Sequence, residues 1–274
     1  MKANPIKSVI GWLKQGFYFK ALMVHLLIGL GITVFVYGCL KRTQQLAVER
    51  WFAKRLLRLF NIQLKIVGDT YPTWQTDQTA YLFVSNHISW IDVFALNAVG
   101  PVRFIAKAEI SQWPLLGRLA RRTGTLFIER GRRHAVRRVV HEAAHRLNQG
   151  QPIAVFPEGT TTTGEHVLPF HSNFIHAAVL AQAPVVPVTI QYVNSNNEHT
   201  TTPAYVDNQS LVENVLMLIQ NRGQFTVVLT FHEPINAQLD RHDIAQQALH
   251  TIRQSLRKTP NPIDSCGTLR KNLP

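Results

Sequence analysis

The residues best suited to chemistry in this chain lie in two short motifs. In the segment NHISWID (86–92), His87 precedes Asp92 with four residues between them, and the segment FPEGT (156–160) contains Glu158 and Gly159. A histidine whose ring is oriented by a carboxylate can take the proton of a hydroxyl group. The two motifs together predict acyl transfer to an alcohol, in which His87 is the base, Asp92 orients it and the second motif holds the acceptor.

Each motif follows an apolar run that is typical of a buried strand, at 81–84 and 153–156. Ligands of open α/β sheets bind at the C-terminal ends of strands, so both motifs stand where a site is expected. We expect a helix to begin near Ser89, which would cap it, with Asp92 in its first turn. For the first motif alone there is a purely structural interpretation, in which Asp92 serves the helix N-terminus and His87 is a loop residue.

The second motif supplies groups for a polar ligand. Glu158 can accept hydrogen bonds from the acceptor or orient a neighbouring cation, and Gly159 allows the backbone to approach a ligand closely. Thr160 and Thr161 begin a run of threonines whose hydroxyl and N–H groups suit a polar headgroup. The alternative for this run is an ordinary loop with solvated threonines.

Two basic residues follow predicted strands. Arg130 comes after the strand predicted at 125–128, where a guanidinium group can make bidentate contacts to a phosphate or carboxylate. Lys107 comes after the strand predicted at 102–106 and is either a further anion contact or a surface lysine. His141 and His145 stand four residues apart on a helical pattern. No carboxylate–histidine motif of the zinc-protease type accompanies them, so we predict no metal site.

Short β-rich runs alternate with helical patterns along most of the chain. This alternation predicts an α/β fold with a mixed, largely parallel sheet flanked by helices. The predicted strands are 63–67, 80–85, 102–106, 125–128, 152–156, 185–192 and 225–231, and the predicted helices are 44–61, 90–98, 113–123, 132–148, 173–182, 211–220 and 243–256. We predict three parts: N-terminal membrane-anchoring helices at 1–60, the α/β domain at 61–258 and a loose C-terminal tail at 259–274.

The segment 21–40 contains no Asp, Glu, Lys or Arg. As a helix it would extend about 30 Å, the thickness of one hydrocarbon core. Lysines and arginines flank it on both sides, so the charge pattern gives no orientation. We predict an N-terminal membrane-associated helical motif. It is either a re-entrant or interfacial hairpin, for which residues 1–19 could lie amphipathically on the surface, or a single-pass anchor.

The composition favours a membrane partner. Lys and Arg total 29 against 16 Asp and Glu, giving a formal net charge of +13. This excess suits an anionic membrane surface, and no zinc-finger spacing, RNP-type motif or basic heptad helix supports nucleic acid as a partner. Cys39 and Cys266 do not support a disulfide framework and are compatible with a reducing cytoplasmic setting. A serine hydrolase is not supported, because the chain has no Gly-x-Ser-x-Gly elbow.

Taken in this order, the motifs resemble those of the glycerolipid acyltransferase family over about residues 60–235. The matching blocks are His87 and Asp92, then Gly124, Phe127, Ile128 and Arg130, then the FPEGT segment, then Val186-Pro187-Val188, with a Lys-x-Glu…Pro…Gly stretch from Lys107 to Gly117. Each block alone is weak to moderate as a signal, and the combination is highly specific.

The resemblance implies an α/β domain on an N-terminal two-helix membrane motif. It also implies that His87 is the general base, that Arg130 contacts the acceptor phosphate, and that Val186 and Pro187 lie on the acyl-donor side. The implied donor is acyl-CoA or acyl carrier protein, and no cofactor is needed besides this co-substrate. The expected location is a bacterial-type inner membrane, with the catalytic domain on the cytoplasmic side and with anionic lipids and a lysolipid acceptor as partners.

Two positions depart from the family pattern. The third block usually continues Glu-Gly-Thr-Arg-Ser, whereas here Thr161 replaces the arginine, and the usual Lys-x-Gly downstream is His171-Ser172-Asn173. The breadth of the family favours 1-acyl-glycerol-3-phosphate as the acceptor, which would give phosphatidate. The Glu-Gly-Thr-Thr variant resembles the lyso-ornithine lipid acyltransferase branch, so lyso-ornithine lipid is the alternative acceptor. A more distant alternative is a non-catalytic protein that binds anionic lipids.

Overall fold

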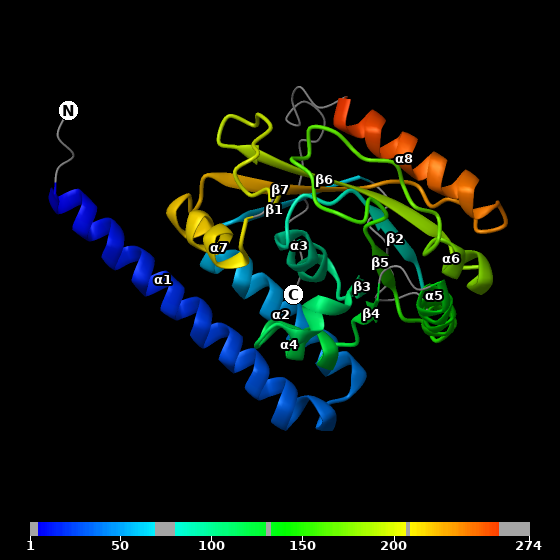
Figure 1. Cartoon of the computed structure of the whole chain (residues 1–274), viewed down its shortest axis with the longest axis horizontal. Coiled ribbons are helices and arrows are strands. Elements are labelled where there is room, and N and C mark those ends of the chain that lie inside the picture. The colour runs from blue at the N-terminus through cyan, green and yellow to red at the C-terminus, as the bar shows by residue number, and fades with distance from the viewer. Residues whose placement is uncertain (1–4, 69–79, 130–132, 207–208, 258–274) are drawn as a thin grey trace, which may run out of the picture.

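The computed structural model describes residues 5–68, 80–129, 133–206 and 209–257, and within these ranges the side chains are described except at 5–13 and 133. In the described ranges seven strands form one sheet, in the order β1-β7-β6-β2-β5-β3-β4 (Figure 1). The strands are β1 (Gln63–Val67), β2 (Leu82–Ser85), β3 (Arg103–Lys107), β4 (Leu126–Ile128), β5 (Ile153–Val155), β6 (Val185–Asn194) and β7 (Phe225–Phe231).

The sheet is mixed and largely parallel, which confirms the predicted fold class. β2 runs parallel to β5 and to β6 on its two sides, and β3 runs parallel to β5 and β4. β6 and β7 are antiparallel, and β1 lies parallel to β7 at the edge. Arg103 and Leu82 both pair with Ile153. Strands β2, β3 and β5 therefore begin at the same end of the sheet, and β2 and β5 finish at the opposite end.

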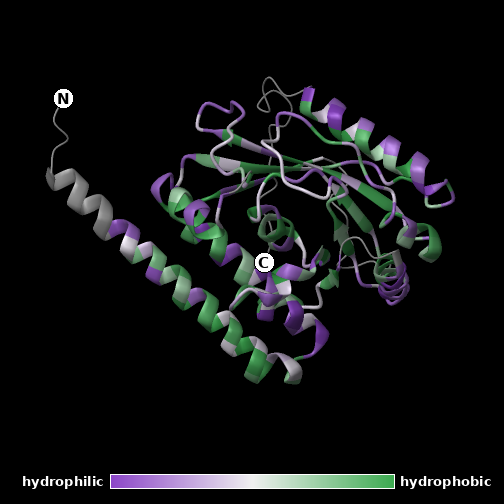
Figure 2. Cartoon of the chain, in the orientation of Figure 1, coloured by the Kyte–Doolittle hydropathy of each residue, from purple (hydrophilic) through white to green (hydrophobic). Residues whose placement is uncertain are grey.

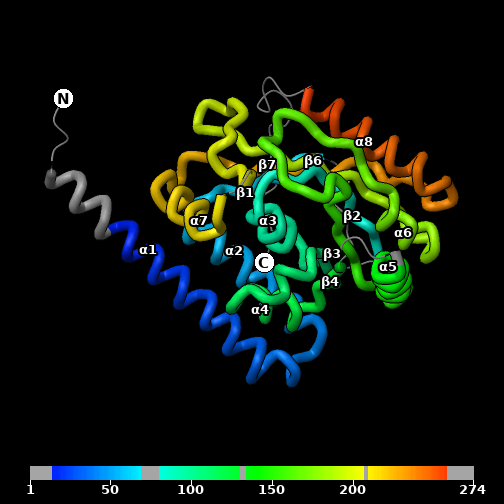
Figure 3. Tube along the Cα trace, in the orientation of Figure 1, coloured from blue at the N-terminus to red at the C-terminus, as the bar shows by residue number. Residues whose placement is uncertain are grey.

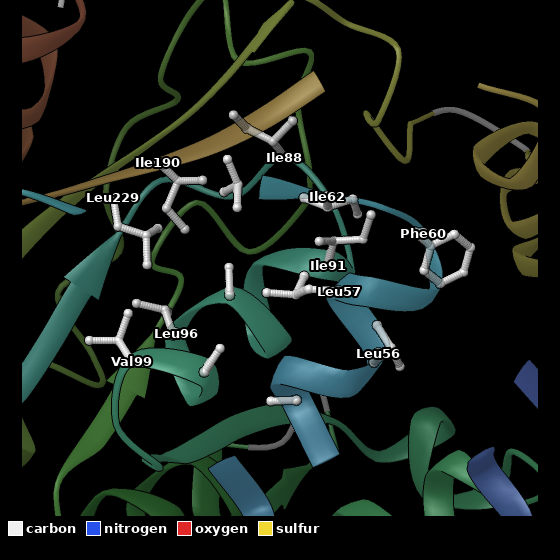
Figure 4. Packing of buried hydrophobic residues seen from close by; sticks show 14 of the residues in the cluster. Leu56, Leu57, Phe60, Ile62, Ile88, Ile91, Leu96, Val99, Ile190 and Leu229 are labelled. Carbon is white, nitrogen blue, oxygen red and sulfur yellow. The ribbon is translucent and has the colours of Figure 1, made fainter. Parts of the chain in front are cut away.

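Helices cover both faces of this sheet (Figure 1). They are α1 (Pro5–Gly31), α2 (Arg42–Leu59), α3 (Ile91–Val99), α4 (Leu116–Arg122), α5 (Arg133–Asn148), α6 (His176–Ala181), α7 (Leu211–Gln220) and α8 (Arg241–Arg257). Because side chains alternate across a strand, Phe83 joins a core with α2, α3 and α7, whereas Leu82 and Val84 join a second core with α5, α6 and α8. Figure 4 shows the first core between α2, α3 and the sheet.

Two predicted helices begin later than their apolar patterns suggested. The helix predicted at 113–123 is preceded by a 3-10 turn, η3 (Ala108–Gln112), and α4 begins only at Leu116, after Leu115 with φ at 62°. Pro114 explains the break, because proline disfavours helical geometry in the residue before it. The helix predicted at 173–182 is the shorter α6.

The first two helices form a hairpin. α1 continues through a π-helical turn, η1 (Ile32–Val36), and a 3-10 turn, η2 (Tyr37–Cys39), and the chain then reverses into α2 (Figure 3). The hairpin thus joins the apolar segment to α2, and the chain reverses at Leu40 and Lys41, where that segment ends. Lys14–Cys39 is long and apolar enough to cross a membrane, judged by length and composition alone, and about a third of an 18-residue apolar stretch within it is buried.

α2 is integral to the core. Ala53, Leu56 and Leu57 are almost fully buried in the first core, together with Leu22 and Leu26 of α1. The outward face of α1 and η1 is different, with large apolar side chains exposed to solvent, among them Phe17, Val24, Leu27, Val34 and Phe35 (Figure 2). The division into parts at residues 60 and 61 stays a prediction, and the predicted tail at 259–274 lies outside the described residues.

Candidate active site

His87 and Asp92 lie side by side just after the C-terminal end of β2. β2 ends at Ser85, and α3 begins at Ile91 with Asp92 in its first turn. The His87 Nδ1 atom lies 2.8 Å from Asp92 Oδ2. An ionised carboxylate only accepts hydrogen bonds, so Nδ1 donates and the neutral ring keeps Nε2 as an acceptor. A fifth of the His87 side chain is exposed, whereas Asp92 is fully buried.

Asp92 is held by a dense set of donors. Its Oδ2 atom also accepts the backbone N–H of Ile88 at 2.7 Å and of Ser89 at 2.9 Å. Its Oδ1 atom accepts the hydroxyl of Tyr192, from β6, at 2.6 Å. These bonds compensate the buried charge and fix the plane of the carboxylate against the His87 ring.

Sequence reasoning missed Tyr192 as part of the site. The hydroxyl of Tyr192 is buried, and burial together with the negative charge of Asp92 raises its pKa well above the ordinary value. Tyr192 therefore stays protonated and donates to Asp92. The available signal was a tyrosine at the end of an apolar strand, because a buried hydroxyl requires a hydrogen-bond partner.

The helix begins close to the predicted start near Ser89, but Ser89 is not its N-cap. Trp90 is the N-cap of α3 and makes no side-chain cap, while the Ser89 Oγ atom lies 3.4 Å from the backbone N–H of Ile91. The Asp92 carboxylate accepts the N–H groups of Ile88 and Ser89, which would have no partner within the helix. The residues before α3 thus form a loop around the carboxylate rather than a first helical turn.

Glu158 fixes the backbone of His87. It is buried, and its Oε1 atom accepts the backbone N–H of His87 at 2.7 Å, while its Oε2 atom accepts that of Leu168 at 2.8 Å. Burial raises the pKa of Glu158, and the two backbone hydrogen bonds oppose that rise. Contact between Glu158 and an acceptor or a cation stays a prediction, whereas its contacts in the structure position the loop that carries His87.

Aromatic rings form one wall of the site. The Phe156 ring stacks on the His87 imidazole, with centroids 3.9 Å apart and an angle of 10° between the planes. Phe104 stacks beyond Phe156 at 6.0 Å. On the other side, the Asn86 amide bonds both the N–H and the carbonyl of Ile190 in β6. The ring of His87 is thus held by Phe156 and Asp92, and the Asn86–Ile190 hydrogen bonds fix the backbone beside it.

The threonine loop packs back on His87. Gly159 has φ at 73°, in the left-handed region that favours glycine, and its N–H donates to the carbonyl of Phe156 at 3.1 Å. The Thr161 hydroxyl donates to the carbonyl of Tyr205, and the N–H of Thr162 donates to the carbonyl of His87 at 2.9 Å. Thr160 is exposed. This loop is therefore structured rather than solvated along its whole length, and Thr161 brings a neutral group to it.

The remaining residues predicted to bind the acceptor or the donor differ in their exposure. Lys107 is exposed at the C-terminal end of β3 and pairs in register with Ile128 of β4. Val186 and Pro187 are buried in β6, beside Phe83 and Val84 of β2. Arg130 lies outside the described residues. Roles in acceptor and donor binding stay predictions for all four.

Comparison with known proteins agrees with this geometry. Residues 64–191 match the family described as Acyltransferase. A lyso-ornithine lipid O-acyltransferase from Pseudomonas aeruginosa is 35% identical over 216 residues, which cover 78% of this chain and 80% of that protein. This chain belongs to the acyltransferase family.

Two further comparisons bear on this acyltransferase. A 1-acyl-sn-glycerol-3-phosphate acyltransferase from Neisseria meningitidis serogroup B is 38% identical over 170 residues, covering 62% of this chain and 64% of that protein. The crystal structure of the 1-acyl-sn-glycerophosphate acyltransferase PlsC from Thermotoga maritima superposes with a TM-score of 0.68 at 21% identity, covering 91% of this chain and 96% of that one. The structural match supports the fold, and the predicted resemblance is confirmed.

Proposed function

We propose that this acyltransferase moves a fatty acyl chain from the thioester of acyl-CoA or acyl carrier protein to the free hydroxyl of a lysolipid. The observation that carries this proposal is the His87 Nδ1–Asp92 hydrogen bond, which leaves Nε2 as an acceptor for a hydroxyl proton. The ring lies at the C-terminal end of a strand in an α/β sheet, which is where such sheets bind ligands.

The reaction proceeds by direct attack. His87 Nε2 removes the proton of the acceptor hydroxyl as its oxygen attacks the thioester carbon, and Asp92 stabilises the imidazolium that forms. When the tetrahedral intermediate collapses, the C–S bond breaks and the imidazolium returns its proton to the leaving thiolate. The reaction is balanced in atoms and charge, and it needs no metal or redox cofactor.

Stabilisation of the oxyanion falls to backbone N–H groups of the threonine loop. The N–H of Gly159 itself donates to Phe156, so the donors would be those of the following residues, beginning with Thr160. Donors fixed in a folded loop need no reorganisation when charge develops on the oxygen. Lys107 and Arg130 are the predicted cations for the headgroup of the acceptor.

A membrane location follows from the substrate and from the hairpin. The exposed apolar face of α1 and η1 would enter the lipid, and the net charge of +13 would favour an anionic surface. The catalytic domain would lie on the cytoplasmic side of a bacterial-type inner membrane, where acyl-CoA and acyl carrier protein are present.

1-Acyl-glycerol-3-phosphate is the first candidate acceptor, in line with the Neisseria relative that is named for it. Lyso-ornithine lipid is the second, and two observations favour it. Thr161 stands where the family usually has an arginine, and its hydroxyl is bonded to the Tyr205 carbonyl. The Pseudomonas relative named for that lipid also matches over four-fifths of its length.

An acyl-transfer assay on the purified full chain tests the proposal. Acyl-CoA and acyl carrier protein donors are each offered with 1-acyl-glycerol-3-phosphate and with lyso-ornithine lipid, and His87→Ala is the control. We expect a product that wild type forms and His87→Ala does not. Phosphatidate would support the first acceptor and ornithine lipid the second. A fully active His87→Ala variant would contradict the mechanism, and transfer to neither lipid would contradict the proposed acceptors.

A further inference from the structure

A cavity of about 440 Å³ lies at the N-terminal ends of β3 and β5, at the opposite end of the sheet from His87. Its wall includes Arg103, the first residue of β3, which pairs with Ile153, the first residue of β5. His87 lies two residues after the end of β2, which is parallel to β5. The cavity and the His87 site therefore lie at opposite ends of the same parallel strands, and the cavity is separate from the proposed reaction.

Four arginines from four different elements line this cavity. Arg42 begins α2, Arg103 begins β3, Arg122 ends α4, and Arg146 lies near the end of α5. Residues far apart in the sequence thus direct positive charge to one place. Like charges repel at short range, so this convergence costs free energy unless negative charge compensates it.

Carboxylates compensate only two of these four charges. Glu49 is buried against Arg103, with oxygens 2.6 and 3.0 Å from its guanidinium nitrogens. Glu142 lies 2.8 Å from Arg146. The side chains of Arg42 and Arg122 have no carboxylate partner among the described residues. The cavity therefore keeps an excess of two positive charges.

The environment of Arg42 shows the consequence of this crowding. Desolvation of its guanidinium group and the nearby charge of Arg103 both lower the pKa of Arg42. Arginine nevertheless stays protonated in proteins, so the repulsion persists. Arg122 makes one long contact, at 3.4 Å, to the carbonyl of Thr33. Both guanidinium groups are thus available to an anion that would relieve the repulsion.

We propose that this cavity binds the phosphate group of an anionic phospholipid. Guanidinium groups match phosphate oxygens through paired hydrogen bonds, and basic cavities beside membrane helices bind such headgroups. The lipid source follows from the neighbourhood. Tyr37 lies on the wall, and the two residues before it, Phe35 and Val36, are 81% and 46% exposed. Acyl chains of a lipid whose headgroup occupies the cavity would lie against these apolar side chains.

Binding can be tested without any acyl transfer, so this proposal and the proposed function can fail separately. The full chain in detergent is titrated with dihexanoyl phosphatidylglycerol and, in a second arm, with inorganic phosphate, and binding is followed by calorimetry. The test variant is Arg42→Gln/Arg122→Gln. The matched control is Arg241→Gln/Arg257→Gln, which removes the same charge from the first and last residues of α8.

Wild type is expected to bind the short-chain lipid saturably and more tightly than inorganic phosphate. The cavity variant should bind it roughly thirtyfold more weakly. Each arginine near an anionic lipid surface contributes about 1 kcal/mol of binding free energy, and the variant lacks two. The α8 control should bind as wild type does. In flotation with vesicles of equimolar phosphatidylcholine and phosphatidylglycerol, the cavity variant should likewise recover less protein than the control.

Arg42→Lys/Arg122→Lys keeps the charge and guards against misfolding as an explanation. It should bind more tightly than the glutamine variant but less tightly than wild type, because lysine lacks the paired donors of a guanidinium group, and all variants should have the same far-UV spectrum as wild type. Equal weakening in the cavity variant and in the α8 control would show general surface attraction and would overturn the site. Inorganic phosphate bound as tightly as the lipid would overturn the lipid as its source.

Discussion

At the C-terminal ends of the parallel strands, the single carboxylate of Asp92 accepts four hydrogen bonds. At their N-terminal ends, the guanidinium group of Arg42 donates none to a described side chain or carbonyl. The first charge is fully buried and fully compensated, and its donors fix one geometry. The second is one of several like charges around an open cavity. In this molecule, compensated charge orients a reacting group, and uncompensated charge lines the site at which we propose that a ligand binds.

The most severe way to break the first arrangement is Asp92→Asn. The amide NH₂ would face one of the hydrogen-bond donors that now donate to Asp92, so His87 Nδ1 would lose its fixed acceptor. We expect kcat to fall by about a thousandfold or more, in line with the loss seen when a catalytic histidine takes the wrong tautomer. Steady-state kinetics measures this, with the lysolipid that wild type acylates in the transfer assay as acceptor. A rise in KM alone, with kcat unchanged, would contradict the orienting role.

Tyr192→Phe sharpens the comparison by removing one of the four donors without changing the ring. Oδ1 of Asp92 would be left buried without its hydroxyl donor. We expect the free energy of unfolding to fall by about 2 kcal/mol and kcat to fall roughly tenfold. Urea unfolding and kinetics on the same preparation measure both. Tyr205→Phe is a matched control, because the contact that Tyr205 makes at the threonine loop is through its backbone carbonyl.

Glu158→Gln tests the support of His87 from β5 and has a smaller expected effect. The folded protein holds the Glu158 proton more tightly than the unfolded chain, because burial raises the pKa above 4.5. The wild-type free energy of unfolding therefore falls as pH rises from 4.5 through the folded pKa, and it levels off above that. The glutamine variant lacks this fall, so its stability relative to wild type should rise over that range. Urea unfolding at a series of pH values measures the difference, and parallel curves would contradict it.

Arg42→Gln/Arg122→Gln should have the smallest effect on turnover. These side chains lie at the far end of the sheet from His87, so kcat with acceptor dispersed in neutral detergent should equal that of wild type within twofold. Thermal unfolding should be unchanged or slightly higher, because the substitution removes repulsion around Arg103. A large fall in kcat in neutral detergent would mean that the two ends are coupled.

Local sequence patterns predicted most helices and strands of the fold. The strands β1 and β7 and the helix α7 have the residue bounds that the apolar patterns predict, because each is a short run with a clear period and polar residues at both ends. A boundary failed where a proline intervened. Pro114 interrupts the helix predicted at 113–123, and α4 begins only at Leu116.

The sequence by itself determined the pairing of His87 with Asp92, the alternation that makes an α/β sheet and the apolar N-terminal segment. These depend on spacing within one or two elements. Only the tertiary structure decided that Tyr192 completes the support of Asp92, that Glu158 holds the backbone of His87, and that four arginines converge at the opposite end. Each of those contacts joins residues from different strands or helices, so it depends on strand order and register, which the pattern of a single segment does not contain.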